Sequence, residues 1–170
     1  MRAETGAVRG ASIVAALDAA RTAGADGREL LAEAVRRIEG ASERFDWVGA
    51  YMLEDGELVL GPYVGAPTDH VRIPVGRGVC GTAVAEDRDI NVPDVREIGN
   101  YIACSVGTRS ELVVLIREPG SGRVLGQLDL DSDRVAAFTE ADEREIRAVA
   151  AWLGAALARP DAGGPDPRGA

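Results

Sequence analysis

The spacing of apolar residues changes along the chain and divides it into helical and extended parts. Residues 12–23 repeat alanine, leucine and valine at the three- and four-residue intervals of an amphipathic helix. A second run at helical spacing follows over residues 26–40 and ends at Gly40. From Phe45 onward the period shortens toward two, which is typical of strands. The first forty residues are therefore predicted to be helical, and the middle of the chain to be a sheet.

Six short runs are predicted to be strands. The first two are joined by an Asp55-Gly56 turn, which is typical of a hairpin. A glycine-rich turn over residues 76–81 is expected to lead into a helix over 82–86, and residues 94–109 are expected to form a loop. Thr139 is predicted to cap a last amphipathic helix. The predicted strands are residues 47–53, 58–60, 71–74, 90–92, 111–116 and 124–130.

This order of elements predicts an α+β domain with a mostly antiparallel central sheet. The N- and C-terminal helices are expected to pack on one face of the sheet and to leave a ligand pocket on the other. We expect one domain over residues 1–158, with N-terminal helices in 11–40 and a core in 45–158. Residues 159–170 contain Pro, Gly and Asp and no apolar residue beyond alanine, so they are predicted to be a disordered tail.

Acidic residues interrupt the two most strand-like segments. Asp129 and Asp131 are two residues apart, so on a strand they share one face, and Glu111 lies in the neighbouring predicted strand. A buried carboxylate is costly unless something pairs with it, and two on one face resist ionising together. A cationic ligand group would relieve that cost. Together with the thiol of Cys104, the acids indicate either redox chemistry on a small cationic molecule or a binding pocket.

Composition excludes several classes of function. The 170 residues carry a net charge of −9, and all 19 basic residues are arginine. This charge argues against nucleic acid or an anionic membrane as a partner, and the absence of lysine excludes Schiff-base chemistry and a Walker-type phosphate site. No apolar run resembles a signal peptide or a membrane span. Two cysteines in such a chain predict reduced thiols and a cytoplasmic location.

The glycine-rich stretch 71–83, the segment 102–104 with Cys104, and the acidic strands 110–114 and 128–132 follow one another in a fixed order. This order of motifs resembles the GAF-domain enzymes that reduce free methionine-(R)-sulfoxide. This resemblance implies a GAF fold, reduction of free methionine sulfoxide without a cofactor or metal, and an external thiol reductant such as thioredoxin or a small thiol. A homodimer is a further expectation. The matching stretches cover most of residues 45–142 and are 45–51, 58–62, 71–83, 92–95, 102–104, 110–114 and 128–132.

The resemblance also implies a role for each candidate residue. Cys104 matches the catalytic thiol, and Cys80 matches a second cysteine of the family. The acids match the carboxylates that hold the substrate's ammonium group and act near the sulfoxide oxygen, and the aromatic residues match those that enclose the methyl sulfoxide. These positions are Glu111, Asp129 and Asp131 for the acids, and Trp47 and Tyr51 for the aromatic residues.

The chain departs from the family pattern around the thiol. His70 stands where the family usually carries its resolving cysteine, and Tyr101, Ser105 and Leu115 stand where His, Asp and Pro are usual. Two other functions therefore stay open: a non-catalytic GAF sensor of an amino-acid-like ligand, and a dimerisation module with a vestigial pocket. Each candidate also has a structural interpretation. Trp47 and Tyr51 could be core residues and Cys80 a small buried hydrophobe, and a metal site of His70 with the aspartates is remote because one histidine is thin ligation.

Overall fold

A computed structural model describes residues 7–99 and 107–158, and its centre is a six-stranded antiparallel sheet of order β3-β2-β1-β6-β5-β4. The strands are β1 (Trp47–Glu54), β2 (Glu57–Val64), β3 (Arg72–Pro74), β4 (Ile90–Val92), β5 (Ser110–Arg117) and β6 (Val124–Ser132). The helices are α1 (Gly10–Thr22), α2 (Gly27–Glu39), α3 (Gly78–Ala85), the 3₁₀ turn η1 (Val95–Glu97) and α4 (Glu140–Leu157). The predicted α+β class with a mostly antiparallel sheet is confirmed. Cys104 and the predicted tail over 159–170 lie outside the described residues.

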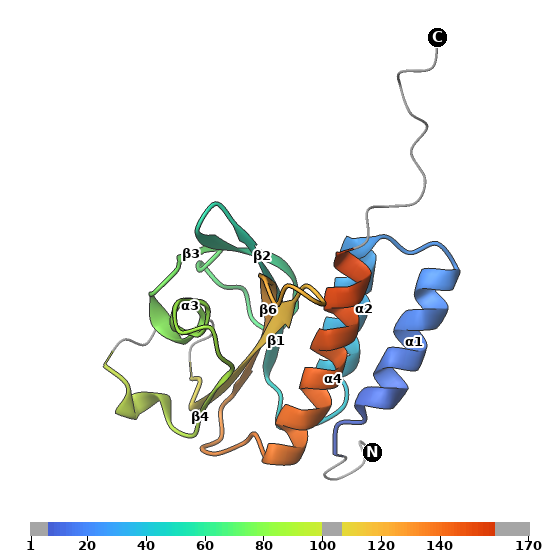
Figure 1. The fold of residues 1–170 in the computed structure, drawn as a ribbon. Coiled ribbons are helices and arrows are strands. Elements are labelled where there is room, and N and C mark those ends of the chain that lie inside the picture. Colours follow the sequence, from blue (N-terminus) through green and yellow to red (C-terminus); the bar gives the residue numbers. More distant parts are fainter. Residues whose placement is uncertain (1–6, 100–106, 159–170) are drawn as a thin grey trace.

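The helices form layers on the two faces of the sheet (Figure 1). α2 and α4 pack directly on one face, as the sequence predicts for the terminal helices. α1 packs on α4 and α2 and forms an outer layer behind them, so the expectation that it lies on the sheet needs correction. α3 packs on the opposite face, against β5, β3, β2 and β6. The expected pocket face is therefore the one covered by α3 and the neighbouring loops.

Alternation along the central strands separates an apolar face from a polar one. On the helix-covered face, side chains of β1, β5 and β6 are fully or almost fully buried against α2 and α4. Burial of such side chains contributes roughly 1.5–3 kcal/mol each, which makes this face the main source of stability. The sheet residues involved are Val48, Ala50, Leu112, Val114, Leu128 and Leu130. The residues between them point to the other face, and they include all three predicted acids.

Capping explains where α2 and α4 begin. Asp26 accepts a hydrogen bond from the Glu29 amide, and the Glu29 carboxylate accepts one from the Asp26 amide. The same reciprocal capping box joins Thr139 and Asp142 at the start of α4, which confirms the predicted cap. The Asp142 carboxylate also binds Arg44, so this cap ties α4 to the segment that precedes β1.

The β1–β2 hairpin has the predicted turn, but β2 is longer than predicted. Asp55 and Gly56 both have positive φ, at 49° and 81°, as a type I′ turn requires. β2 runs on to Val64 instead of ending at residue 60, because a bulge lies between Gly49 and Tyr51 in the pairing of β1 with β2. Pro62 lies in this irregular stretch, where a missing amide proton costs no regular ladder bond.

α3 begins earlier than predicted. The helix was expected over residues 82–86 after a glycine-rich turn, but it spans Gly78–Ala85 and includes the last two glycines. A Cβ at Gly81 would lie 2.5 Å from the Pro74 carbonyl oxygen. Glycine is therefore needed inside this helix because α3 packs closely against the end of β3. This requirement comes from tertiary packing, so local propensity could not reveal it.

Candidate active site

The pairing of β1, β6 and β5 fixes which side chains meet on the face covered by α3. We call the three residues that lie opposite one another on β1, β6 and β5 a row, and successive rows on this face are two residues apart along each strand. Row one holds Trp47, Asp131 and Glu111; row two holds Gly49, Asp129 and Val113; row three holds Tyr51, Gln127 and Leu115. The predicted acids and aromatic residues therefore lie within three adjacent rows.

The three acids are buried together. Glu111, Asp129 and Asp131 are each 1% exposed or less. Burial, followed by the nearby charges of Asp129 and Asp46, raises the pKa of Asp131 well above its ordinary value, and a hydrogen bond from Thr108 opposes this only in part. A buried carboxyl with a raised pKa holds its proton at a pH where an exposed aspartate has lost it. Row one therefore contains a group that can donate a proton.

Cys80 reaches this cluster from α3. Its Sγ lies 3.7 Å from Glu111 Oε1, and both groups are buried. One ligand atom each from Cys80, Glu111 and Asp129 lies within 4.8 Å of the other two. A small cationic group can therefore contact all three. His70, which the remote metal hypothesis required, is not a member of this group.

Trp47 and Tyr51 form one wall of the cluster. The Trp47 indole is fully buried, donates a hydrogen bond from Nε1 to the Ala66 carbonyl at 3.1 Å, and stacks on Tyr63 at 5.5 Å between centroids. A Cβ at Gly49 would overlap the Trp47 ring, so this glycine makes room for the indole. Tyr51 donates its hydroxyl proton to the His70 carbonyl at 2.9 Å. Both aromatic residues belong to the pocket-face core and border the acids.

The fold and these motifs match known proteins. The GAF domain model matches residues 26–157. The chain belongs to the GAF-domain family. It is 43% identical over 116 residues, 68% of each chain, to the free methionine-R-sulfoxide reductase of Escherichia coli strain K12.

Solved structures agree with this family assignment. A type II free methionine-R-sulfoxide reductase from Thermoplasma acidophilum matches 75% of this chain and 89% of its own, at 38% identity and a TM-score of 0.72. The enzyme from Neisseria meningitidis in complex with its substrate matches 91% of this chain and 94% of its own, at 32% identity and a TM-score of 0.77. The resemblance to the GAF-domain free methionine-(R)-sulfoxide reductases is confirmed at the level of the family.

Sequence reasoning missed three features of this GAF pocket. Gln127 continues the line of Asp131 and Asp129 along β6 and is fully buried. Tyr63 of β2 stacks on Trp47, and Gly49 gives the indole its space. The period-two pattern of polar residues at 127, 129 and 131 is a signal that could have found Gln127.

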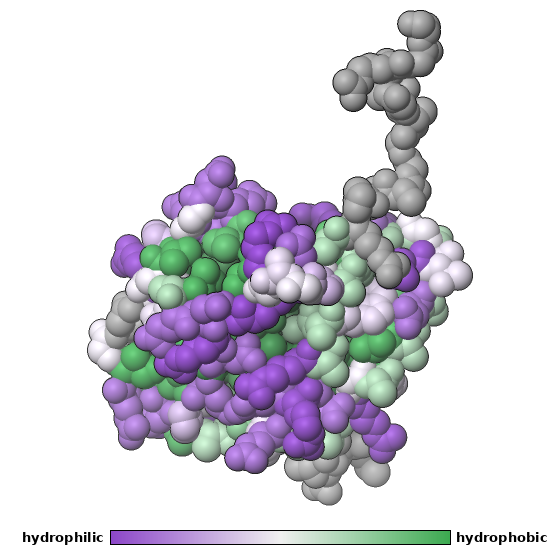
Figure 2. Space-filling model, in the orientation of Figure 1, coloured by the Kyte–Doolittle hydropathy of each residue, from purple (hydrophilic) through white to green (hydrophobic). Residues whose placement is uncertain are grey.

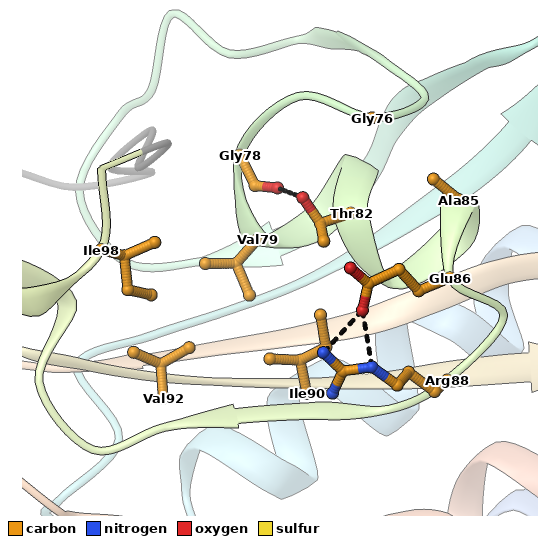
Figure 3. Close-up of a pocket in the computed structure, with 10 residues that line it drawn as sticks. All are labelled: Gly76, Gly78, Val79, Thr82, Ala85, Glu86, Arg88, Ile90, Val92 and Ile98. Atoms are coloured by element: carbon orange, nitrogen blue, oxygen red, sulfur yellow. Dashed lines mark hydrogen bonds and ion pairs between the residues drawn. The ribbon is translucent and has the colours of Figure 1, made fainter.

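A separate hollow of about 480 Å³ is lined by residues of α3, of β4 and of the segments beside them (Figure 3). Val79, Ile90, Val92 and Ile98 project into it, and the Glu86–Arg88 ion pair lies at its rim. None of the three buried acids lines this hollow. We take the acids as the candidate site, because clustered buried ionisable groups, one of them with a raised pKa, are typical of functional sites.

Figure 2 shows hydrophobic residues in separate patches among hydrophilic ones on this side of the molecule. No helix in residues 7–99 or 107–158 has both the length and the apolar character that crossing a bilayer requires.

Proposed function

We propose that this GAF domain reduces free L-methionine-(R)-sulfoxide to methionine, as an oxidoreductase that acts on sulfur. The observation that carries the proposal is the set of three buried carboxylates beside a buried indole on the pocket face. A free amino acid offers a cationic ammonium group, which a cluster of buried carboxylates attracts, and its methyl sulfoxide end offers an apolar methyl group to an aromatic wall. The family assignment supports the same substrate.

The acids divide into two tasks in this proposal. Asp129, in the middle row and close to Glu111 and Cys80, binds the ammonium group of the substrate. Asp131, which has a raised pKa and lies beside Trp47 in row one, stays protonated and donates its proton toward the sulfoxide oxygen. A proton donor is needed because the oxygen leaves sulfur most readily when it is protonated.

Cys104 is the proposed nucleophile, and it lies outside the described residues. Its thiolate attacks the sulfoxide sulfur and forms an S–S bond. As the protonated oxygen moves to the cysteine sulfur, the S–O bond of the substrate and this S–S bond both break, which leaves methionine and a cysteine sulfenic acid. The substrate sulfur gains two electrons and the Cys104 sulfur loses two. A second thiol then condenses with the sulfenic acid, releases water and forms a disulfide, which an external dithiol such as thioredoxin reduces.

The resolving thiol is either Cys80 or an external molecule. Cys80 is only 2% exposed and lies inside α3, so leaving this position would disturb helix packing. His70, at the family's usual resolving position, is held by its backbone carbonyl against Tyr51. We therefore propose that an external thiol resolves the sulfenic acid, with no cofactor required.

A single-turnover experiment tests this reaction. The reduced protein is mixed with one equivalent of methionine-(R)-sulfoxide without external thiol, and both methionine and intact protein mass are measured. We expect methionine release with a gain of one oxygen in wild type, and neither in Cys104→Ser. A loss of two hydrogens would instead assign resolution to Cys80, and His70→Cys is expected to produce such a loss. Binding without methionine release would leave a small-ligand sensor.

Substrate size tests the role of the carboxylates. N-acetylation converts the ammonium group to a neutral amide, which leaves the buried acids without a cation. We expect the acetylated sulfoxide to react at least tenfold more slowly than the free amino acid, because a lost charge-assisted hydrogen bond is worth roughly that factor or more. Equal rates would contradict the assignment of the acids to the ammonium group.

A further inference from the structure

Gln127 is a fully buried polar side chain that the reaction described above does not use. It is 0% exposed, and neither Oε1 nor Nε2 has a hydrogen-bond partner in the part of the chain that the structure describes. A primary amide offers two donors and two acceptor lone pairs, and buried polar groups are rarely left unpaired. Such a group needs a reason to be retained in a core.

Its register places Gln127 at the end of the line of acids. Asp131, Asp129 and Gln127 occupy alternate positions of β6, and Tyr51 and Leu115 flank Gln127 on the neighbouring strands. The side chains of alternate residues point to the same face. Gln127 therefore faces the same side of the sheet as the acids, two rows from Asp131, and it carries no charge.

A free amino acid brings a problem that the acids alone do not solve. Its α-carboxylate is negative and is repelled by a cluster of carboxylates, yet it lies only one carbon away from the ammonium group that they attract. An uncharged group next to the cluster can bind this carboxylate by donating a hydrogen bond to one of its oxygens. Gln127 Nε2 is such a donor, two residues and therefore one row away from Asp129 on the same face of β6.

The dimensions of the ligand agree with this arrangement. Asp131 and Gln127 are four positions apart on an antiparallel strand, so their Cα atoms are separated by about 13.5 Å. The six bonds from the sulfoxide oxygen to a carboxylate oxygen extend about 7 Å, and two hydrogen bonds bring the total to about 13 Å. The order of groups in methionine sulfoxide also matches the strand. The sulfoxide lies at Asp131, the ammonium group at Asp129 and the carboxylate at Gln127.

We infer that Gln127 is a specificity-determining residue that binds the α-carboxylate of the free amino acid through its side-chain amide. This inference rests on the proposed substrate but concerns binding alone, so turnover is not needed to test it. It predicts that the pocket recognises both ends of the amino-acid backbone, and that blocking the carboxylate weakens binding as blocking the amine does.

The test compares the affinities for L-methionine and L-methioninamide, which keeps the ammonium group and loses the negative charge. Calorimetry on the full chain measures Kd for wild type, Gln127→Leu, Gln127→Glu and the neighbouring control Leu115→Met. We expect wild type to prefer methionine about tenfold or more, and Gln127→Leu to lose this preference, because a hydrogen bond to a charged group is worth about that factor. Gln127→Glu should reverse the preference, and Leu115→Met should keep it.

Thermal melting separates this role from a structural one. Removing a buried amide that has no hydrogen-bond partner in residues 7–99 and 107–158 should leave the Tm of Gln127→Leu at or above that of wild type. A lower Tm with an unchanged preference for methionine would overturn the inference and assign Gln127 to the packing of the core. Failure of wild type to bind methionine would also overturn it. A preference that Gln127→Leu abolishes, in a protein that does not reduce the sulfoxide, would uphold the inference while the proposed reaction fails.

Discussion

Asp131 and Asp142 are both 1% exposed, yet the two faces of the domain treat them in opposite ways. Asp142 begins α4 on the helix-covered side, where Arg44 donates two hydrogen bonds at 2.9 and 3.1 Å and Thr139 donates two more. Although burial alone would raise it, these hydrogen bonds lower the pKa of Asp142. Asp131 lies on the pocket face with a raised pKa, and no arginine pairs with it among the described residues.

The contrast separates a buried carboxylate that is paired with a cation of the protein itself from a buried carboxyl group that lies beside other acids. A buried acid that holds its own cation stabilises the protein without help. A buried acid beside like charges costs stability in the free protein, and this cost is recovered only when a proton or a cationic ligand arrives. Asp142 is therefore part of the scaffold, whereas the environment of Asp131 is the one expected of the proposed site.

The largest expected effect comes from breaking the satisfied pair. Arg44→Met should destabilise the protein by about 2–4 kcal/mol, because it leaves the Asp142 carboxylate buried without its cation. For a domain of this size, that corresponds to a decrease in Tm of roughly 5–15 °C. Arg36 on α2, whose side chain is 63% exposed and pairs with Glu33, provides the control. Arg36→Met should change the Tm by no more than a degree or two. A similar loss in both variants would contradict the contrast.

Two glycines sharpen the comparison through packing. A Cβ at Gly154 of α4 would overlap the Arg117 carbonyl oxygen, and backbone cannot move aside easily. Gly154→Ala should therefore cost about 1–3 kcal/mol on the helix-covered face. A Cβ at Gly49 would meet only the Trp47 side chain. Compared with Gly154→Ala, Gly49→Ala should lose less stability, measured by thermal melting, and more affinity for methionine, measured by calorimetry. If Gly154→Ala lost more affinity than Gly49→Ala, Trp47 would not belong to the wall that contacts the ligand.

The central strands and the shared face of the acids could be predicted from sequence, because alternation directly encodes which side of a sheet a residue faces. The early start of α3 could not, since Gly81 is required by the nearby Pro74 carbonyl and not by its own segment. The outer position of α1 could not be predicted either, because an amphipathic pattern shows that one side of a helix is buried but not which element packs against that side. For Gln127 the face was readable, but the missing hydrogen-bond partner is visible only in three dimensions.

Replacing the unsatisfied acid should have a smaller effect in the opposite direction. Asp131→Asn should stabilise the free protein at neutral pH by about 1–2 kcal/mol, because the variant no longer pays for keeping a carboxyl protonated among acids. It should also weaken binding of methionine sulfoxide. Asp142→Asn is the matched variant on the other face, and it should destabilise. A Tm below that of wild type for Asp131→Asn would show that Asp131 is a structural residue.

The smallest effect is the pH dependence of these two substitutions, and its sign differs between them. The pKa of Asp131 is raised on folding, so the folded protein holds more protons than the unfolded chain above about pH 4, and stability falls as the pH rises from there toward the raised pKa. The stabilisation by Asp131→Asn should therefore grow across this range and disappear near pH 4.

Asp142 behaves in the reverse manner, because its pKa is lowered on folding. Its contribution is complete above about pH 4 and is lost as the pH falls through the lowered pKa, so the destabilisation by Asp142→Asn should shrink in acid. Urea unfolding at several pH values between about 3 and 8 measures both differences against wild type. Asp133, whose side chain is 68% exposed, supplies a surface control, and Asp133→Asn should leave the free energy of unfolding close to that of wild type. If the stability differences of Asp131→Asn and Asp142→Asn changed with pH in a way that implied a shift in the same direction for both aspartates, the contrast between their environments would be wrong.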